Sequence, residues 1–295
     1  MTNRDDRSMQ REYERCRTVV DRRLTEFFTQ RGSYDQLLES MRYSLLAGGK
    51  RVRAVICMKF CGASGGEMEK ALDAACAVEM LHTYSLIHDD LPCMDDDDMR
   101  RGKPSNHIKF GEFTATLAGD ALQAAAFETL LDSGLPPSTV VEMGRVLASA
   151  AGPHGICAGQ YLDMLEKPLS MNGLMDTHNR KTAALIAAAA KIGVLAAEGS
   201  QEQIIAADCY AKAIGLVFQV RDDLLDATAT ADELGKSVGS DRKNDKTTFA
   251  TLLGLNECNE FIRANTEDAV AALGGKFNDA GFLIWLAWML AERKH

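Results

Sequence analysis

Six aspartates stand within ten positions of this sequence, from Asp89 to Asp98, and Arg100 and Arg101 follow almost at once. The chain before them is apolar, so these carboxylates close a helix that we expect to be buried. Like charges at this density repel one another unless cations lie between them. Mg2+ prefers one or two carboxylates, several waters and phosphate oxygens. The segment therefore predicts a place where metal ions meet a phosphate-bearing ligand, and the competing interpretation is a solvated loop.

Pro92 should break that helix, and the later aspartates should then emerge on a turn. In an unbroken helix Asp96, seven residues on, would lie almost directly beneath Asp89. After a break at Pro92, the spacing does not choose between Asp95 and Asp96 as the second ligand.

A second acidic cluster lies in "FQVRDDLLD", on a segment that is otherwise apolar. Asp222 and Asp226 are four residues apart and share one helical face, whereas Asp223 points about 100° away. Taken alone, this cluster is equally well explained as a solvated helix end. Together, two acidic patches across a cavity would suit about two or three magnesium ions on a diphosphate.

Basic residues complement the carboxylates, because arginine forks match phosphate oxygens in pairs. The candidates are Lys50, Arg51, Arg53, Arg100, Arg101, Lys103, Arg180, Lys181 and Lys236. His82 lies seven residues before Asp89 and faces the same side of that helix. Taken alone, His82 would more often be a hydrogen-bonded core histidine than a ligand contact.

Long Ala-, Leu- and Met-rich segments predict the elements that must position these groups. We expect helices at 67–90, 111–134, 139–152, 182–199, 202–227 and 279–295, and no convincing period-2 strand. Helices that are apolar nearly all round pack among other helices, so an all-α bundle of roughly ten helices follows. With six prolines and no Ser/Gly/Pro-rich linker, residues 1–295 are expected to form one domain.

Composition excludes some functions. A net charge of -9 argues against nucleic acid as the main partner. The eight cysteines form no CxxC pair, which indicates free thiols in a reducing compartment. The start is charged, and apolar stretches such as 281–291 are too short to span a bilayer. We therefore expect a soluble, cytoplasmic protein without stable membrane insertion.

From about Tyr34 onward the chain resembles a trans-isoprenyl diphosphate synthase of the polyprenyl synthetase family, most closely the bacterial short-chain type that makes farnesyl diphosphate. The motifs that carry this resemblance are "LLAGGKRVR", "HTYSLIHDDLPCMDDDDMRRGKPSNH", "LAGDALQ", "GQYLDM", "FQVRDDLLD" and "GKSVGSDRKNDKTTF". The first aspartate motif, with its two arginines, and the later DDxxD preceded by Gln219 are the most specific of them.

The resemblance implies an isoprenoid synthase fold, in which a large helical bundle surrounds a central substrate cavity. It also implies a magnesium-assisted reaction that joins isopentenyl diphosphate to dimethylallyl or geranyl diphosphate, in a homodimeric enzyme. The implied metal ligands are Asp89, Asp95 and Asp222. The implied contacts to the allylic substrate are Arg100, Lys181, Thr182, Gln219 and Lys236, and those to isopentenyl diphosphate are Gly49, Lys50, Arg53, His82 and Arg101.

Product length is assigned to Tyr84, which lies five residues before Asp89, about 7.5 Å along the helix axis. Helix angles alone favour Ser85, whereas in the family an aromatic residue at position 84 accompanies C15 products. The expected product is therefore farnesyl diphosphate, and the alternatives are a geranylgeranyl diphosphate synthase and an inactive regulatory subunit. Ala54, Ala158 and Ala183 depart from the family pattern without removing a ligand.

Overall fold

The computed structural model describes residues 3–165, 170–228 and 247–293. Most of this described part is helical, which confirms the all-α prediction. Its strands form one short hairpin, β1 (Met99–Arg100) and β2 (Lys103–Pro104), paired antiparallel with Met99 opposite Pro104. Strands of two residues are too short to produce a readable period-2 pattern, so the sequence pattern did not predict them.

The chain divides into two compact units. Unit 1 comprises Met1–Leu147 and Ile192–Gly199, and unit 2 comprises Ala148–Lys191 and Ser200–His295. The assignment of one domain to residues 1–295 stays a prediction.

Unit 1 is built on the helices that precede and follow the first aspartate cluster. Its elements are α1 (Asn3–Thr25), α2 (Asp35–Leu45), α3 (Val52–Ala63), the short 3-10 helix η1 (Met68–Ala71), α4 (Leu72–Asp89), the hairpin, α5 (Asn106–Phe110), α6 (Glu112–Leu131) and most of α7 (Pro137–Ala151). The helix predicted at 67–90 therefore begins with a 3-10 turn and ends at Asp89, before Pro92, as the proline predicts.

The pair α4 and α6 forms the centre of unit 1, and the two helices pack against each other along their length. The buried face of α6 is lined by small residues such as Ala115, Ala118 and Gly119, which allow a close approach of α4. In α4, Met80 and Leu81 are wholly buried. This packing fixes the end of α4, where the carboxylates begin.

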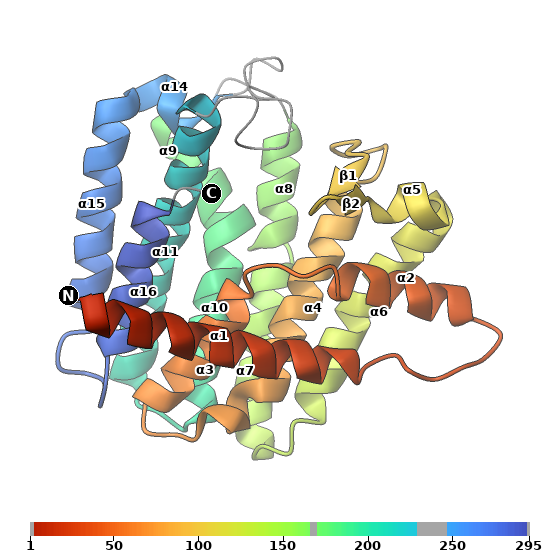
Figure 1. Ribbon diagram of the computed structural model, residues 1–295, viewed down its shortest axis with the longest axis horizontal. Coiled ribbons are helices and arrows are strands. Elements are labelled where there is room, and N and C mark those ends of the chain that lie inside the picture. The colour runs from red at the N-terminus through yellow and green to blue at the C-terminus, as the bar shows by residue number, and fades with distance from the viewer. Residues whose placement is uncertain (1–2, 166–169, 229–246, 294–295) are drawn as a thin grey trace. The chain divides into compact units, whose positions relative to one another are not determined.

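Unit 2 contains α8 (Ile156–Met164), α9 (Met171–His178), the π-helix η2 (Asn179–Ala183), the first residues of α10 (Ala184–Ala196), α11 (Gln201–Thr228), α14 (Phe249–Leu253), α15 (Leu255–Ala272) and α16 (Gly281–Glu292). In Figure 1, α11 and α15 run side by side and α14 lies at one end of this pair. Val217, Val220 and Phe249 form a buried cluster there with Ile262.

Helix α11 is long and apolar enough on average to cross a bilayer. However, 56% of its most apolar window is buried inside the protein, as in the core helix of many soluble proteins. It also carries Asp222, Asp223 and Asp226, so its position is explained by packing within unit 2.

Candidate active site

The last turn of α4 and the loop after it form a closed backbone arrangement. The Asp95 N–H donates to the Asp89 carbonyl oxygen at 2.9 Å, and the Asp96 N–H donates to the Leu91 carbonyl oxygen at 3.2 Å. Asp96 has φ +53°, a left-handed conformation that aspartate tolerates better than most residues. These bonds bring the backbone of Asp95 beside Asp89. The sequence spacing alone did not choose between Asp95 and Asp96.

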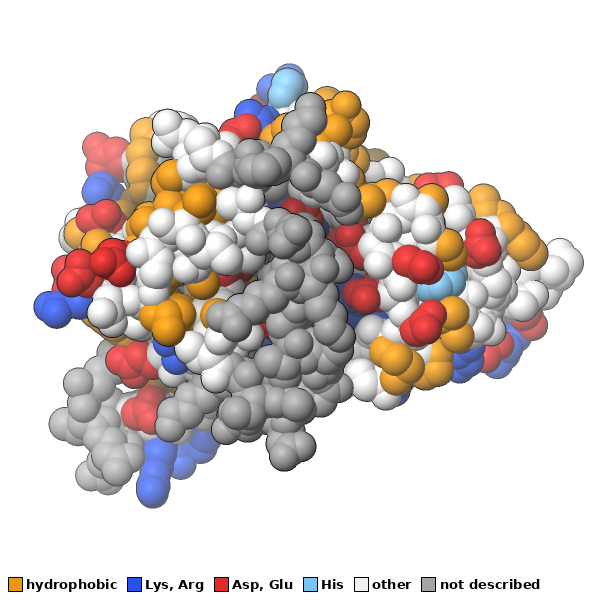
Figure 2. Space-filling model, turned by 90° about the horizontal axis from the view of Figure 1, so that it is seen from above, with side chains coloured by type: hydrophobic (Ala, Val, Ile, Leu, Met, Phe, Trp, Pro, Cys, Tyr) orange, Lys and Arg blue, Asp and Glu red, His pale blue; other side chains and the backbone are white. Residues whose placement is uncertain are grey.

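The side chains of residues 95–98 are exposed to solvent. Figure 2 looks onto the end of unit 1 at which the hairpin lies, and acidic side chains stand at its surface. Carboxylates at such an open edge suit an ion that keeps several waters and takes phosphate oxygens as further ligands.

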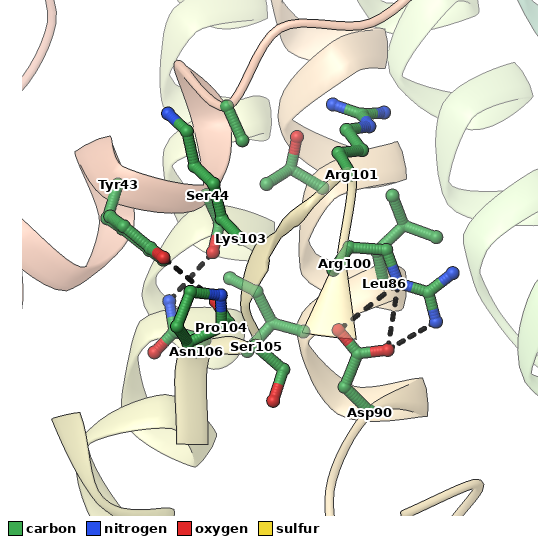
Figure 3. A pocket seen from close by; sticks show the side chains of 13 residues that line it. Tyr43, Ser44, Leu86, Asp90, Arg100, Arg101, Lys103, Pro104, Ser105 and Asn106 are labelled. Atoms are coloured by element: carbon green, nitrogen blue, oxygen red, sulfur yellow. Dashed lines mark hydrogen bonds and ion pairs between the residues drawn. The ribbon is translucent and has the colours of Figure 1, made fainter. Parts of the chain in front are cut away.

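Asp90 has a different role, which sequence reasoning missed. It is only 2% exposed, and Arg100 donates from Nε to its Oδ1 at 2.9 Å and from Nη2 to the same oxygen. Figure 3 shows these bonds between Arg100 and Asp90. Arg100 also reaches Asp97 at 3.1 Å. Burial raises the pKa of Asp90, and the Arg100 guanidinium opposes that shift. Asp90 therefore ties Arg100, on strand β1, to the end of α4, and helical periodicity does not predict this pairing across ten residues.

Arg51 is also a structural residue, although its motif suggested a phosphate contact. Its side chain is 1% exposed and donates to Asp21 at 2.8 Å, to Glu79 at 3.2 Å and to the Leu45 carbonyl oxygen at 2.7 Å. A guanidinium with these partners is committed to joining α1, α2 and α4, so Arg51 is removed from the candidate phosphate ligands.

The glycine pair before it does shape a cation site. Arg101 donates to the Gly48 carbonyl oxygen, and a Cβ on Gly49 would lie 2.9 Å from the Arg101 Cζ atom. Gly49 also has φ +128°, a backbone conformation that favours glycine, and its small size lets the Arg101 guanidinium approach this closely. The Tyr13 hydroxyl donates to the carbonyl oxygen of the exposed Lys50 and ties this loop to α1.

Arg53 and His82 complete this group, with Arg53 Nη1 3.4 Å from His82 Nε2. Burial, and after it the charges of Arg53 and Arg101, hold the pKa of His82 well below its usual range. His82 is therefore neutral at pH 7. Unit 1 thus brings together Gly49, Arg53, His82 and Arg101, which the resemblance assigns to isopentenyl diphosphate.

In unit 2, Lys181 lies on the π-helix η2, where its Nζ atom is 2.6 Å from the Asp163 carboxylate on α8. The two elements approach closely because residue 159 is glycine: a Cβ there would be 2.2 Å from the Lys181 nitrogen. A π-helix often occurs at functional sites. The sequence predicted an α-helix from residue 182 and gave no sign of the π-turn before it.

A chain of hydrogen bonds orients the next two predicted residues. The Thr182 hydroxyl is 3.4 Å from Gln219 Oε1, and Gln219 Nε2 donates to Asp223 at 2.9 Å. Asp223 is buried and also accepts from the Phe249 N–H at 2.8 Å. Asp223 thereby turns the Gln219 carbonyl oxygen toward Thr182. The prediction that Asp223 and Asp222 point in different directions is confirmed.

Asp222 pairs with Arg293, whose Nη2 atom is 2.7 Å from Asp222 Oδ1. The Arg293 guanidinium lies 3.8 Å from the Phe218 ring centroid and donates to the Phe218 carbonyl oxygen. The Arg293 guanidinium therefore covers one face of the Phe218 ring. Burial lowers the pKa of Arg293, although Asp222 acts in the opposite direction.

Within the described residues, no group of three or more His, Cys, Asp or Glu side chains could hold a metal ion by itself. The donors present nevertheless fit magnesium, which usually takes one or two carboxylates and completes its shell with water and phosphate. Asp89, Asp95 and Asp222 remain the predicted ligands. Lys236, predicted to contact the allylic diphosphate, lies outside the described residues.

Both residues assigned to product length lie in the buried part of α4. Tyr84 is 5% exposed, and the Ser85 hydroxyl donates to the His82 carbonyl oxygen of its own helix at 3.0 Å. Only Tyr84 of this pair has the bulk to stop a growing chain.

Comparisons with known proteins show what this chain is similar to. The polyprenyl synthetase family model matches residues 34–277. The chain is 47% identical over 261 residues to a chloroplastic geranylgeranyl pyrophosphate synthase of Capsicum annuum, covering 86% of this chain and 71% of that protein. It is 49% identical over 265 residues to geranylgeranyl pyrophosphate synthase 7 of Arabidopsis thaliana, covering 87% and 76%. An FPP/GFPP synthase structure from Zymomonas mobilis matches with a TM-score of 0.88 and 33% identity, covering 97% of this chain and all of that one.

Proposed function

The chain belongs to the polyprenyl synthetase family, and we propose that it condenses isopentenyl diphosphate with dimethylallyl and then geranyl diphosphate to give (2E,6E)-farnesyl diphosphate. The observation that carries this choice of product is the buried Tyr84 ring on α4, five residues before Asp89.

Binding of the two diphosphates is divided between groups of cations. Arg100, oriented by Asp90, and Lys181, oriented by Asp163, are proposed to contact the allylic diphosphate. Arg53 and Arg101 are proposed to contact isopentenyl diphosphate. The neutral His82 beside Arg53 adds a polar group without adding charge.

Ionisation of the allylic C–O bond begins the reaction. Magnesium ions held by Asp89, Asp95 and Asp222 would neutralise the charge that grows on the departing diphosphate. The main-chain carbonyl of Lys181, the Thr182 hydroxyl and the Gln219 carbonyl oxygen would stabilise the allylic cation by their dipoles.

The double bond of isopentenyl diphosphate then attacks the cation, and a proton leaves the product. Released diphosphate is the proposed proton acceptor, because none of the side chains assigned to the site is an evident general base. The site must exclude water during this step, since water would capture the cation.

The proposed stop for the growing chain is Tyr84. A prenyl tail that starts at the diphosphate near Asp89 would run along α4 toward Tyr84. About 7.5 Å of helix axis separates Asp89 from Tyr84. That length corresponds to one or two isoprene units. Ser85 is too small for this task and uses its hydroxyl within the helix.

A second candidate product is geranylgeranyl diphosphate, because the curated relatives at 47–49% identity carry that name. Incubation of the purified protein with magnesium, isopentenyl diphosphate and each allylic starter distinguishes the two. We expect mainly C15 product from the native protein and C20 or longer products from Tyr84→Ala. A native protein that releases mainly C20 would refute the farnesyl assignment, and no prenyl product at all would support a regulatory subunit.

We also propose a homodimer in the cytoplasm. All eight cysteines are free thiols, as expected in a reducing compartment. Apolar side chains exposed on α6, including Phe113 and Leu117, supply a surface for a second copy.

A further inference from the structure

His88 lies one turn beyond Tyr84 on α4 and is inserted into a gap in α6. A Cβ on Gly119 would lie 2.1 Å from His88 Nε2 and 2.4 Å from its Cδ2, so the ring occupies the space that a side chain at position 119 would need. No other residue type at position 119 leaves this space open.

A hydrogen bond holds the ring in that gap. His88 Nε2 lies 3.0 Å from the carbonyl oxygen of Thr116, so this nitrogen carries the proton and donates it. The carboxylate of Asp120 is 3.8 Å from the same nitrogen, which is too long for a hydrogen bond. The fixed partner is therefore a main-chain atom of α6.

The fixed ring in turn contacts Tyr84. Their ring centroids are 5.7 Å apart at an interplanar angle of 84°, the edge-to-face arrangement that aromatic pairs favour. Tyr84 is buried, so a change of its side-chain rotamer requires space that His88 now fills.

We infer that His88 is a specificity-determining residue: anchored in the Gly119 gap, it holds the Tyr84 ring in the orientation that stops chain growth. The inference rests on the proposed function, in which Tyr84 sets product length. In the proposed mechanism His88 contacts neither substrate nor the reacting atoms, so it is a positioning residue. Its neighbour Asp89 is a predicted metal ligand, and a change in rate alone would therefore say little.

Product length is the informative measurement, because loss of fold or of metal lowers the rate without making products longer. In His88→Ala and His88→Gln, we expect the ratio of C20 to C15 product to rise roughly five-fold over native, the scale of one aromatic pair. Glutamine can still donate to the Thr116 carbonyl, so a longer product in that variant assigns the effect to the lost ring.

Gly119→Ala tests the same lock without touching His88, since the new methyl group must displace the ring. It should also lengthen the product. Two controls should leave product length at the native value: Thr116→Ala, which keeps the main-chain acceptor, and Gly144→Ala, a helical glycine of α7 with no atom within 4 Å of an added Cβ.

The product distribution of each variant is compared with that of the native protein. The test of His88 is therefore separate from the test of the farnesyl assignment. A native protein that makes mainly C20 refutes the farnesyl assignment, yet a further lengthening in His88→Gln and Gly119→Ala still supports the lock. If Tyr84→Ala lengthens the product while active His88→Gln and Gly119→Ala keep the native distribution, His88 does not hold the ring and the inference is wrong.

Discussion

Carboxylates of the two acidic clusters differ in what they bond to, although they are adjacent in sequence. Asp90 and Asp223 are 2% and 7% exposed, and each is bonded to protein donors that orient a predicted substrate contact. Asp95, by contrast, is exposed on the loop. Neighbouring aspartates therefore serve either as orienting groups or as predicted metal ligands.

This division makes Asp95 and Asp96 experimentally distinguishable. We expect Asp95→Asn to lower turnover by at least ~100-fold, the scale of losing a major electrostatic contribution. Asp96→Asn should have a much smaller effect, because asparagine also tolerates the left-handed backbone at that position. Steady-state turnover and the magnesium concentration at half activity measure this, with circular dichroism as the check on folding. A larger loss in Asp96→Asn would transfer the ligand role to Asp96.

The pKa of His82 predicts a pH dependence of stability. Its folded pKa lies well below that of the unfolded chain, chiefly because of burial. As pH falls below about 6.5, the unfolded chain binds a proton that the folded protein does not, so the free energy of unfolding decreases. Above that pH both states are neutral at this residue and the effect vanishes.

Replacement of His82 by glutamine should therefore flatten the decline in stability between neutral pH and the folded pKa. Urea unfolding at a series of pH values measures it. The exposed His154 provides the control, since His154→Gln should retain the native pH profile. An unchanged profile in His82→Gln would mean that His82 is not the group responsible.

Among the elements, α8 and η2 depend on one glycine for their contact. Ala at position 159 places a methyl group 2.2 Å from the Lys181 nitrogen, so η2 must move or α8 must bend. We expect Gly159→Ala to cost about 1–3 kcal/mol of stability, as overpacking does. It should also lower turnover, because Lys181 and Thr182 move with η2. Denaturant unfolding and turnover check both effects.

The matched substitution Gly144→Ala has open space around the added methyl group. It should be neutral or stabilising by up to about 1 kcal/mol, since alanine is the better helix former. Equal stability and turnover in both variants would show that the contact between α8 and η2 tolerates the methyl group.

Six helices could be predicted from the sequence, because each is rich in helix formers and bounded by breakers: α4, α6, α7, α10, α11 and α16. Short helices such as α5 and α14 could not, since five residues carry no readable helical period. Pro92 correctly placed the end of α4. The π-turn at Lys181 and the 3-10 turn at Met68 could not be predicted. An apolar pattern with a period near 3.6 indicates a helix, but it does not distinguish a single 3-10 or π turn from an α-helical one.

The site was predictable in residue type but not in pairing. The family resemblance assigned Arg53, His82 and Arg101 to one group, and they do lie together. The bond of Arg293 to Asp222 depends on how distant segments pack, and that of Arg100 to Asp90 depends on the turn between them. No local periodicity carries that information.

At the scale of the whole molecule, α6 carries an exposed apolar face that no other described residue of the chain covers. Phe113 is 74% exposed and Leu117 is 50% exposed, one helical turn apart, and Ile108 on α5 is also exposed. A large apolar patch on the surface of a protein typically marks an interaction site. A second copy of the chain is the occupant that the proposed homodimer supplies.

The native protein should therefore sediment as a dimer, and Phe113→Asp combined with Leu117→Asp should sediment as a folded monomer, because charges cannot be buried unpaired in such an interface. Analytical ultracentrifugation measures the mass, and circular dichroism checks the fold. Val141→Asp, at a comparably exposed apolar residue on α7, is the control and should remain dimeric. If the native protein is a monomer, the homodimer proposal fails; if the double variant stays dimeric, the interface lies elsewhere than on α6.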